Sequence, residues 1–141
     1  MDANRKFLDE HALLQHLGIS IDRQAEGEVH LSLPHDDSLA NPGSDTLQGG
    51  VVATLIDHAG GAAIRTTLED PLETPHATTD LNVTYLRPAT GDLSAEATVL
   101  RSGRSMGVVR VEVSAETPEG EQRVATGRVS LHLSRDSATD G

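Results

Sequence analysis

A glycine pair followed by a carboxylate is the part of this chain whose residue types and spacing can do chemistry. Gln48 precedes Gly49 and Gly50, and Asp57 lies about two turns further along an apolar helical pattern. Glycines allow a ligand to approach the backbone closely, and the free N–H groups at the start of a helix favour negative charge. An oxyanion that forms at a carbonyl would be stabilised there, and the carboxylate can act on the same group. The segment therefore predicts a site that attacks a carbonyl.

The composition limits the class of protein. With 141 residues the chain is long enough for one domain with its own core, so we expect a single domain over residues 1–141. The chain has no cysteine, which excludes disulfides, thiolate zinc sites and cysteine nucleophiles. No apolar run approaches the roughly 18 residues of a membrane span, and residues 1–10 lack the apolar segment of a secretory signal. We therefore expect a cytoplasmic protein.

The balance of charges excludes some partners. The formal net charge is −11, which argues against nucleic acids and anionic membrane surfaces. Lys6 is the only lysine among the 11 basic residues, and the others are arginines. An acidic, lysine-poor surface is typical of a salt-rich cytoplasm, but a GC-rich genome also replaces lysine with arginine. Stability measured against KCl concentration separates these two interpretations, because only a halophilic protein is expected to lose its structure at low salt.

The hydrophobic periodicity predicts an α+β fold. Apolar residues share one stripe from Asn4 to Leu17, which predicts an N-terminal helix within residues 1–17. A flexible, polar tail is expected over residues 134–141. The long central helix is predicted over 51–66, and strands are predicted over 19–22, 28–33, 79–86, 93–101, 107–117 and 123–133. This segregated order indicates an antiparallel sheet wrapped around the central helix.

Three segments, in their order and spacing, carry a resemblance to a known family. They are Leu47–Asp57, Thr78–Ala89 and Val99–Ser105. Together they resemble the hotdog-fold acyl-CoA thioesterases, in particular the phenylacetate-pathway (PaaI-type) branch of the 4-hydroxybenzoyl-CoA thioesterase superfamily. The resemblance implies a hotdog fold and hydrolysis of an acyl-CoA to a free acid and coenzyme A. It implies no metal and no cofactor other than the coenzyme A of the substrate.

The resemblance also assigns roles around the carbonyl. The family's catalytic acid falls on Asp57, and the glycine whose N–H polarises the thioester carbonyl falls on Gly49. Gln48 stands where members commonly have histidine, and its amide can donate a hydrogen bond but cannot act as a general base. A hydroxyl that supports the acid falls on Thr78, with the next threonine along the chain as the alternative. Asn41 lies near the family's upstream polar residue, which helps to place water.

Further positions are expected to bind the substrate. Arg101, Gly103 and Arg104 look like the family's edge where the coenzyme A nucleotide lies, because its phosphates favour a local basic patch. Gly50 adds a second N–H beside the reacting group, and Arg87 adds another positive charge. By the same resemblance, we expect a homodimer, and a dimer of such dimers, with the acid of one subunit facing the glycine pair of the other.

Several alternatives stay open. Asp57 can act as a nucleophile that forms an anhydride, or as a general base towards water. His58 should point about 100° away around the helix, towards a loop or a subunit interface. The histidines have no convincing metal-ligand spacing. Rival functions are a hotdog-fold dehydratase or hydratase, a non-catalytic acyl-CoA sensor, and a thioesterase for acyl groups carried by a protein.

Overall fold

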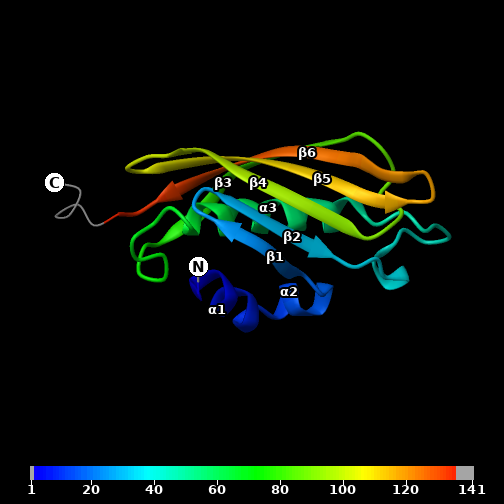
Figure 1. The fold of residues 1–141 in the computed structure, drawn as a ribbon, viewed down its shortest axis with the longest axis horizontal. Coiled ribbons are helices and arrows are strands. Elements are labelled where there is room, and N and C mark those ends of the chain that lie inside the picture. Colours follow the sequence, from blue (N-terminus) through cyan, green and yellow to red (C-terminus); the bar gives the residue numbers. More distant parts are fainter. Residues whose placement is uncertain (1, 136–141) are drawn as a thin grey trace.

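The protein is an antiparallel sheet curved around one long helix (Figure 1). The structure is a computed structural model and describes residues 2–135. The helices are α1 (Asp2–Glu10), α2 (Ala12–Leu17), the short 3-10 helix η1 (Asp37–Leu39) and α3 (Gly49–Arg65). The strands are β1 (Ser20–Ala25), β2 (Glu28–Leu33), β3 (His76–Tyr85), β4 (Leu93–Ser102), β5 (Met106–Thr117) and β6 (Gly120–Leu133).

The sheet has six strands in the order β1-β2-β4-β5-β6-β3, and every neighbouring pair is antiparallel. Short turns join β4, β5 and β6, whereas the chain between β2 and β3 crosses the sheet as α3. β3 therefore lies at one edge, paired only with β6, although it precedes β4 in the chain. The predicted α+β class with a sheet wrapped around the central helix is confirmed.

Strict alternation places the sheet's apolar residues on its inner face. On β5, Val109, Val111 and Val113 are fully buried, and the residues between them are more exposed. Such alternation is the period-two pattern of a half-buried strand. The buried side chains of the sheet and of α3 form one hydrophobic cluster in the described part of the chain. Aliphatic residues supply almost all of this core.

Helix α3 is bounded by polar groups at both ends. Gln48 before it is extended, with φ −59° and ψ 141°, and its carbonyl accepts hydrogen bonds from Val51 and Val52. After the helix, the hydroxyls of Thr66 and Thr67 donate to the carbonyls of the last turn. These bonds satisfy carbonyls that have no partner inside the helix. The helix begins two residues before the predicted range and ends one residue before its end.

The helix lies close to the sheet because small residues face it. An added Cβ at Gly60 would lie 2.8 Å from Val129 on β6. On the other side of the same contact, a Cβ at Gly127 would lie 2.9 Å from Ile56 and 2.8 Å from a strand carbonyl. Both glycines thus allow a separation between helix and sheet that any larger residue would forbid.

The N-terminal segment differs from the single helix predicted for it. It forms α1 and α2, and His11 between them is extended with φ −99° and ψ 104°. The ring nitrogen of His11 accepts a 3.4 Å hydrogen bond from Leu14 and so caps α2. The prediction of one continuous helix is wrong, because apolar periodicity does not register a side chain that caps a new helix. Figure 1 shows both helices on the β1 side of the molecule.

Two further expectations concern the C-terminal tail and a membrane-spanning segment. Of the predicted tail 134–141, residues 136–141 lie outside the described residues. Within residues 2–135, no helix is long and apolar enough to cross a membrane.

The contact between α3 and β6 can be tested with two alanine exchanges. We expect Gly60→Ala to lower the free energy of unfolding by about 1–3 kcal/mol, because the new methyl overlaps Val129. Gly50→Ala in the same helix meets nothing within 4 Å and should raise the free energy by roughly 0.5–1 kcal/mol through helix propensity. Urea denaturation at fixed protein concentration measures both. A gain at both positions would contradict the close packing.

Candidate functional site

Asp57 lies on the third turn of α3 and is held by the edge strand. Its Oδ1 accepts a 2.7 Å hydrogen bond from the Thr78 hydroxyl on β3. The neighbouring Thr79 instead donates to the Ser130 carbonyl at 3.3 Å, so Thr78, rather than Thr79, supports the acid. The register of β3 against β6 shifts between Thr78 and Asp80, and such an irregularity changes where side chains point. Asp57 itself is half-buried, as expected.

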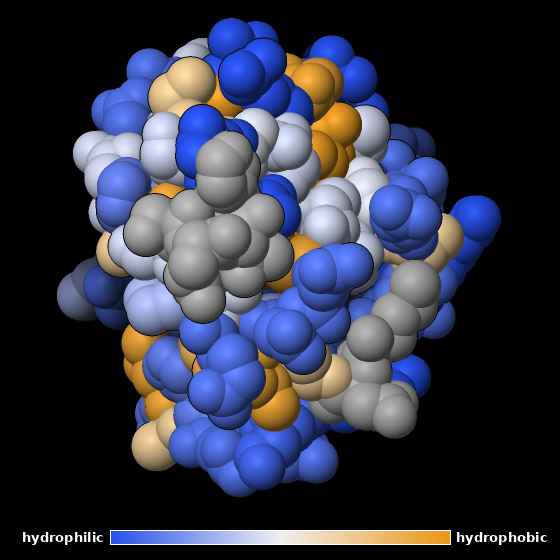
Figure 2. Space-filling view, turned by 90° about the vertical axis from the view of Figure 1, so that its left-hand side faces the viewer, coloured by the Kyte–Doolittle hydropathy of each residue, from blue (hydrophilic) through white to orange (hydrophobic). Residues whose placement is uncertain are grey.

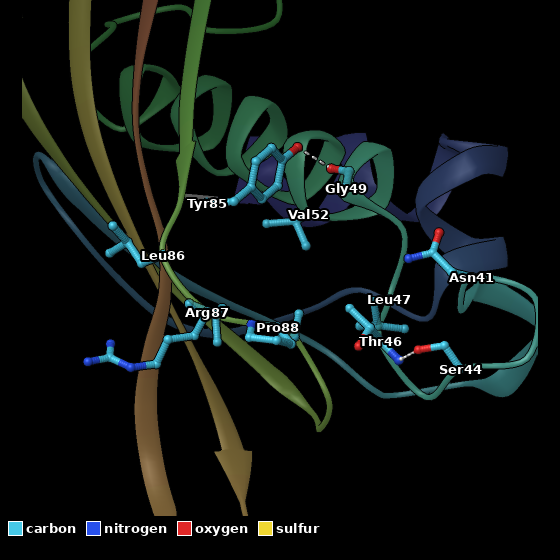
Figure 3. A pocket seen from close by; sticks show the side chains of 12 residues that line it. Asn41, Ser44, Thr46, Leu47, Gly49, Val52, Tyr85, Leu86, Arg87 and Pro88 are labelled. Carbon is cyan, nitrogen blue, oxygen red and sulfur yellow. Dashed lines mark hydrogen bonds between the residues drawn. The ribbon is translucent and has the colours of Figure 1, made fainter.

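The start of α3 presents free backbone donors. In the described residues, the N–H groups of Gly49 and Gly50 have no hydrogen-bond acceptor. The Gln48 side chain is exposed and does not cap the helix. The Tyr85 hydroxyl, at the end of β3, donates to the Gly49 carbonyl at 2.5 Å, as Figure 3 shows. This bond fixes the peptide that follows Gly49 while the N–H groups at the helix start stay available to a ligand.

A cavity of about 590 Å³ lies beside this helix start. Asn41, Gly49, Tyr85 and Arg87 are among the residues that line it, with apolar side chains between them. Asn41 belongs to the loop before α3, where its N–H donates to the Thr46 carbonyl. The Arg87 guanidinium points away from Gly49 in Figure 3 and donates to the Arg123 carbonyl at 2.8 Å. Three of the predicted site residues, Asn41, Gly49 and Arg87, therefore line the same cavity.

A second, smaller cavity of about 130 Å³ lies at Asp57. It is lined by Phe7, Asp57, His58, Gly61, Arg65, His76, Ala77, Thr78 and Leu131. The predicted acid and its supporting hydroxyl thus lie together, but in a different cavity from the glycine pair. Asp57 follows Gly49 by eight residues on one helix, which is a rise of about 12 Å. Within one chain, the two groups cannot contact the same carbonyl.

The predicted coenzyme A edge lies at the far end of α3. Gly103 and Arg104 follow β4 in its turn to β5, and Arg101 is near the end of β4. The Ser102 hydroxyl there lies 2.8 Å from the Thr67 hydroxyl, just beyond the helix. Arg101 and Arg104 are exposed. Figure 2 shows that hydrophilic side chains dominate this end of the molecule, with separate hydrophobic spots between them.

His58 packs against the N-terminal helices rather than against a loop. Its ring centroid is 4.9 Å from that of His11 and 6.2 Å from that of Phe7. Burial lowers the pKa of His58, although the adjacent Asp57 opposes this shift. Burial thus favours the neutral form of this ring, which lines the smaller cavity. Within residues 2–135, no group of three or more histidine or carboxylate side chains could hold a metal ion.

Four residues near these cavities were missed by the sequence reasoning: Phe7, Arg65, His76 and Tyr85. The chain has one Phe, one Tyr and no Trp, and both aromatic residues line a cavity. Their scarcity was itself a signal, because such a chain does not use aromatic residues to fill its core. Arg65 was also visible as the one charged residue after Asp57 in an apolar helix.

Comparison with known proteins identifies the family. Residues 45–121 match the family model of the thioesterase superfamily. A putative esterase of Halobacterium salinarum is 44% identical over 137 residues, which cover 94% of this chain and 91% of that protein. The medium/long-chain acyl-CoA thioesterase YigI of Escherichia coli is 32% identical over 113 residues, or 71% of this chain and 73% of that protein. The chain belongs to the thioesterase superfamily. It is a thioester hydrolase, as the resemblance implies.

Solved structures share its hotdog fold. A thioesterase family protein from Silicibacter pomeroyi is 27% identical, with a TM-score of 0.86 over 92% of this chain and 94% of that chain. The PaaI protein of the Escherichia coli phenylacetic acid degradation operon has a TM-score of 0.78 at 23% identity, over 91% of this chain and 88% of that chain. The predicted resemblance to PaaI-type hotdog thioesterases is thus confirmed.

The buried His58 predicts a component of stability that depends on pH. Because burial lowers its pKa from 6.5, the unfolded chain binds this proton more readily than the folded one. The free energy of unfolding should therefore fall as the pH drops below 6.5, and part of this fall should be absent in His58→Gln. Chemical denaturation between about pH 8 and about pH 5, a range that brackets the ordinary pKa of histidine, measures this difference. His132→Gln, on the exposed face of β6, is the control. An unchanged slope in His58→Gln would contradict the assignment.

Proposed function

We propose that the protein hydrolyses acyl-CoA thioesters to a free acid and coenzyme A. Relatives support this substrate class: YigI is a medium/long-chain acyl-CoA thioesterase, and human acyl-coenzyme A thioesterase 13 is 28% identical over 117 residues. In the proposed reaction, coenzyme A is part of the substrate, and no separate cofactor or metal takes part. The proposal rests on one observation: Asp57 contacts Thr78 near the start of the edge strand, and Gly49 contacts Tyr85 at its end.

The free edge of β3 is the surface that we expect a second copy to cover. β3 pairs with β6 on one side, so its other edge offers backbone N–H and C=O groups to another strand. Leu81 and Tyr85 on this strand are 39% and 52% exposed, although both are large and mostly apolar. A second β3 added in the antiparallel sense would cover this edge and extend the sheet across a two-fold axis. Association of two such dimers stays a prediction from the resemblance.

The two-fold axis decides which groups meet. On β3, Thr78 contacts Asp57, and Tyr85 contacts Gly49. If two β3 strands pair with their centre near Leu81, Thr78 of one copy lies beside Tyr85 of the other. Asp57 of one copy then lies close to Gly49 of the other. Each dimer would hold two complete sites, whereas a single chain holds two separated halves.

Such a site supports hydrolysis by either of two routes. The Gly49 and Gly50 N–H groups would bind the carbonyl oxygen of the thioester, and the exposed Gln48 amide would add a donor. As a general base, Asp57 removes a proton from water, the water oxygen bonds to the acyl carbon, and the thiolate leaves and is protonated. As a nucleophile, Asp57 bonds to the acyl carbon and expels the thiolate, and water then hydrolyses the anhydride. Asn41, at the larger cavity, is proposed to help place this water.

The proposed two-fold axis would also bring positive charge to the coenzyme A nucleotide. It turns the β4–β5 end of one copy towards the larger cavity of the other, with Arg101, Gly103 and Arg104 at the tip. The exposed Arg101 and Arg104 would bind phosphate groups there. Arg87 lines the same cavity and adds a third charge, although its guanidinium also holds the Arg123 carbonyl.

The role of Asp57 is tested by its isosteric amide. We expect Asp57→Asn to lower kcat for acyl-CoA hydrolysis by about 10²–10⁴, because an amide can neither attack the carbonyl nor remove a proton from water. Thiol release from acetyl-, hexanoyl-, phenylacetyl- and hydroxybenzoyl-CoA measures the rate. Asp9→Asn is the control, since Asp9 is exposed on α1 and lines neither cavity. Equal activity of Asp57→Asn and native protein would remove Asp57 from the mechanism.

The shared site is tested by complementation between two inactive variants. Gly49→Pro deletes one N–H at the first helical position, where proline is compatible with the helix. Gly49→Ala carries a similar added bulk near Tyr85, retains the N–H and serves as its control. When Gly49→Pro and Asp57→Asn chains are mixed and exchanged, we expect about a quarter of the native activity, because half the dimers are mixed and one of their two sites is intact.

The result of mixing separates the two possible arrangements. Sites formed within one chain would give no recovery, since every chain then lacks either the carboxylate or the N–H. Each variant must first be shown to be inactive alone, and its dimer content measured by light scattering. No recovery between chains that do exchange would overturn the proposed interface.

A further inference from the structure

Arg65 is buried without a carboxylate beside it. It lies in the last turn of α3 and is only 6% exposed. In the described residues, no Asp or Glu lies within ion-pair distance of it. A buried guanidinium without a counter-anion is unfavourable, because the charge loses its hydration. Burial accordingly lowers the pKa of Arg65 to about 10.

The neighbours of Arg65 fix its position but use few of its donors. Its Nε donates to Asn4 Oδ1 at 2.7 Å, and its Nη1 donates to His76 Nε2 at 3.1 Å. Because arginine is only a donor, His76 must accept at Nε2, and its Nδ1 donates to the Thr74 carbonyl at 2.8 Å. The Phe7 ring lies against the guanidinium, 3.9 Å from ring centroid to Cζ.

This arrangement leaves donors available in the smaller cavity. Arginine has five N–H donors, and two of them have acceptors in the described residues. No buried side-chain nitrogen or oxygen in these residues lacks a partner, and Nη2 has no acceptor there, so Nη2 is accessible rather than sealed in the core. Arg65 lines the cavity of about 130 Å³ together with Asp57. The free donors therefore face a space that a small ligand can enter.

The guanidinium lies one helical turn beyond the proposed catalytic carboxylate. Gly61 follows Asp57 by four residues and precedes Arg65 by four. An added Cβ at Gly61 would lie 3.3 Å from Arg65 Nη1, so the guanidinium lies over this glycine. One turn is about 5.4 Å along the helix, which a short acyl chain can span. The absence of a side chain at Gly61 lets the guanidinium lie against the helix on the Asp57 side of Arg65.

From this geometry we infer that the cavity selects short acyl groups that end in a carboxylate, with Arg65 as the group that binds it. The inference rests on the proposed acyl-CoA hydrolysis and names its substrate class as ω-carboxyacyl-CoA. The reacting thioester lies at Asp57, the acyl chain extends towards Gly61, and the terminal carboxylate accepts hydrogen bonds from Nη2 of the guanidinium that lies over this glycine. The terminal carboxylate would bind a guanidinium that is fixed and desolvated, and charge-assisted hydrogen bonds are strong in such a place.

A purely structural role for Arg65 does not explain its buried charge or its remaining donors. Arg65 does tie α1 to α3, since Asn4 also donates to the Ala62 carbonyl at 2.9 Å. An uncharged side chain that donates to Asn4 Oδ1 and packs on Phe7 would hold the two helices together as well. The buried charge and its unused donors are what a neutral side chain could not provide, and both lie at the cavity that contains Asp57.

The first test compares two acyl-CoA substrates of equal chain length. Adipoyl-CoA carries a terminal carboxylate, and hexanoyl-CoA ends in a methyl group. We expect native protein to have the higher kcat/KM for adipoyl-CoA, and Arg65→Met to lower the ratio of the two values by about tenfold or more. Arg65→Lys, which keeps the charge, should lie between them. Arg110→Met removes an exposed arginine from the outer face of the sheet and should leave the ratio unchanged.

The second test measures binding without catalysis. We expect adipate, but not the uncharged hexanamide, to raise the unfolding temperature of native protein, and Arg65→Met to lose this effect. A native preference for hexanoyl-CoA, or a ratio that Arg65→Met leaves unchanged, would overturn the inference and leave acyl-CoA hydrolysis standing. Adipate binding through Arg65 with no hydrolysis of any acyl-CoA would instead keep the carboxylate site and overturn the proposed function.

Discussion

The close approach of α3 to the inner face of the sheet is the constraint on which the other features depend. Gly60 and Gly127 remove the side chains that would hold helix and sheet apart, and Val129 and Ile56 fill the space between them. The helix occupies the concave face of the sheet. The polar groups of the two cavities lie along α3, at its start, middle and end, and on the edge strand beside it.

The edge strand β3 connects the two halves of the chemistry. Through Thr78 it contacts the carboxylate on α3, and through Tyr85 it contacts the peptide at the helix start. A rigid helix keeps Asp57 and Gly49 about 12 Å apart along its axis, so no side-chain movement can join them within a chain. The proposed two-fold axis at the same strand would remove this obstacle, because it would place the end of one β3 beside the start of the other. In this arrangement, the function requires assembly.

Each of the two aromatic side chains lines one of the two cavities, Phe7 the smaller and Tyr85 the larger. The fully buried core is aliphatic, and Phe7 packs against its border. Phe7 lies between the guanidinium of Arg65 and the ring of His58, and this group closes one side of the small cavity. In the proposed substrate site, α1 would therefore contribute to specificity as well as to packing. Its sequence lies outside the segment that matches the family model, residues 45–121.

The sequence by itself determined the fold class, the central helix and most strand boundaries, because strict alternation and small residues leave few ways to bury the apolar face. It also indicated Asp57 and Gly49 through their spacing, and the family resemblance added Thr78. It did not reveal the break at His11, since a side-chain cap leaves no trace in hydrophobic periodicity. Only the tertiary structure decided that Asp57 and Gly49 lie in separate cavities, and that Arg65 reaches the acid's cavity. Such relations depend on how distant segments pack, and local periodicity carries no information about that packing.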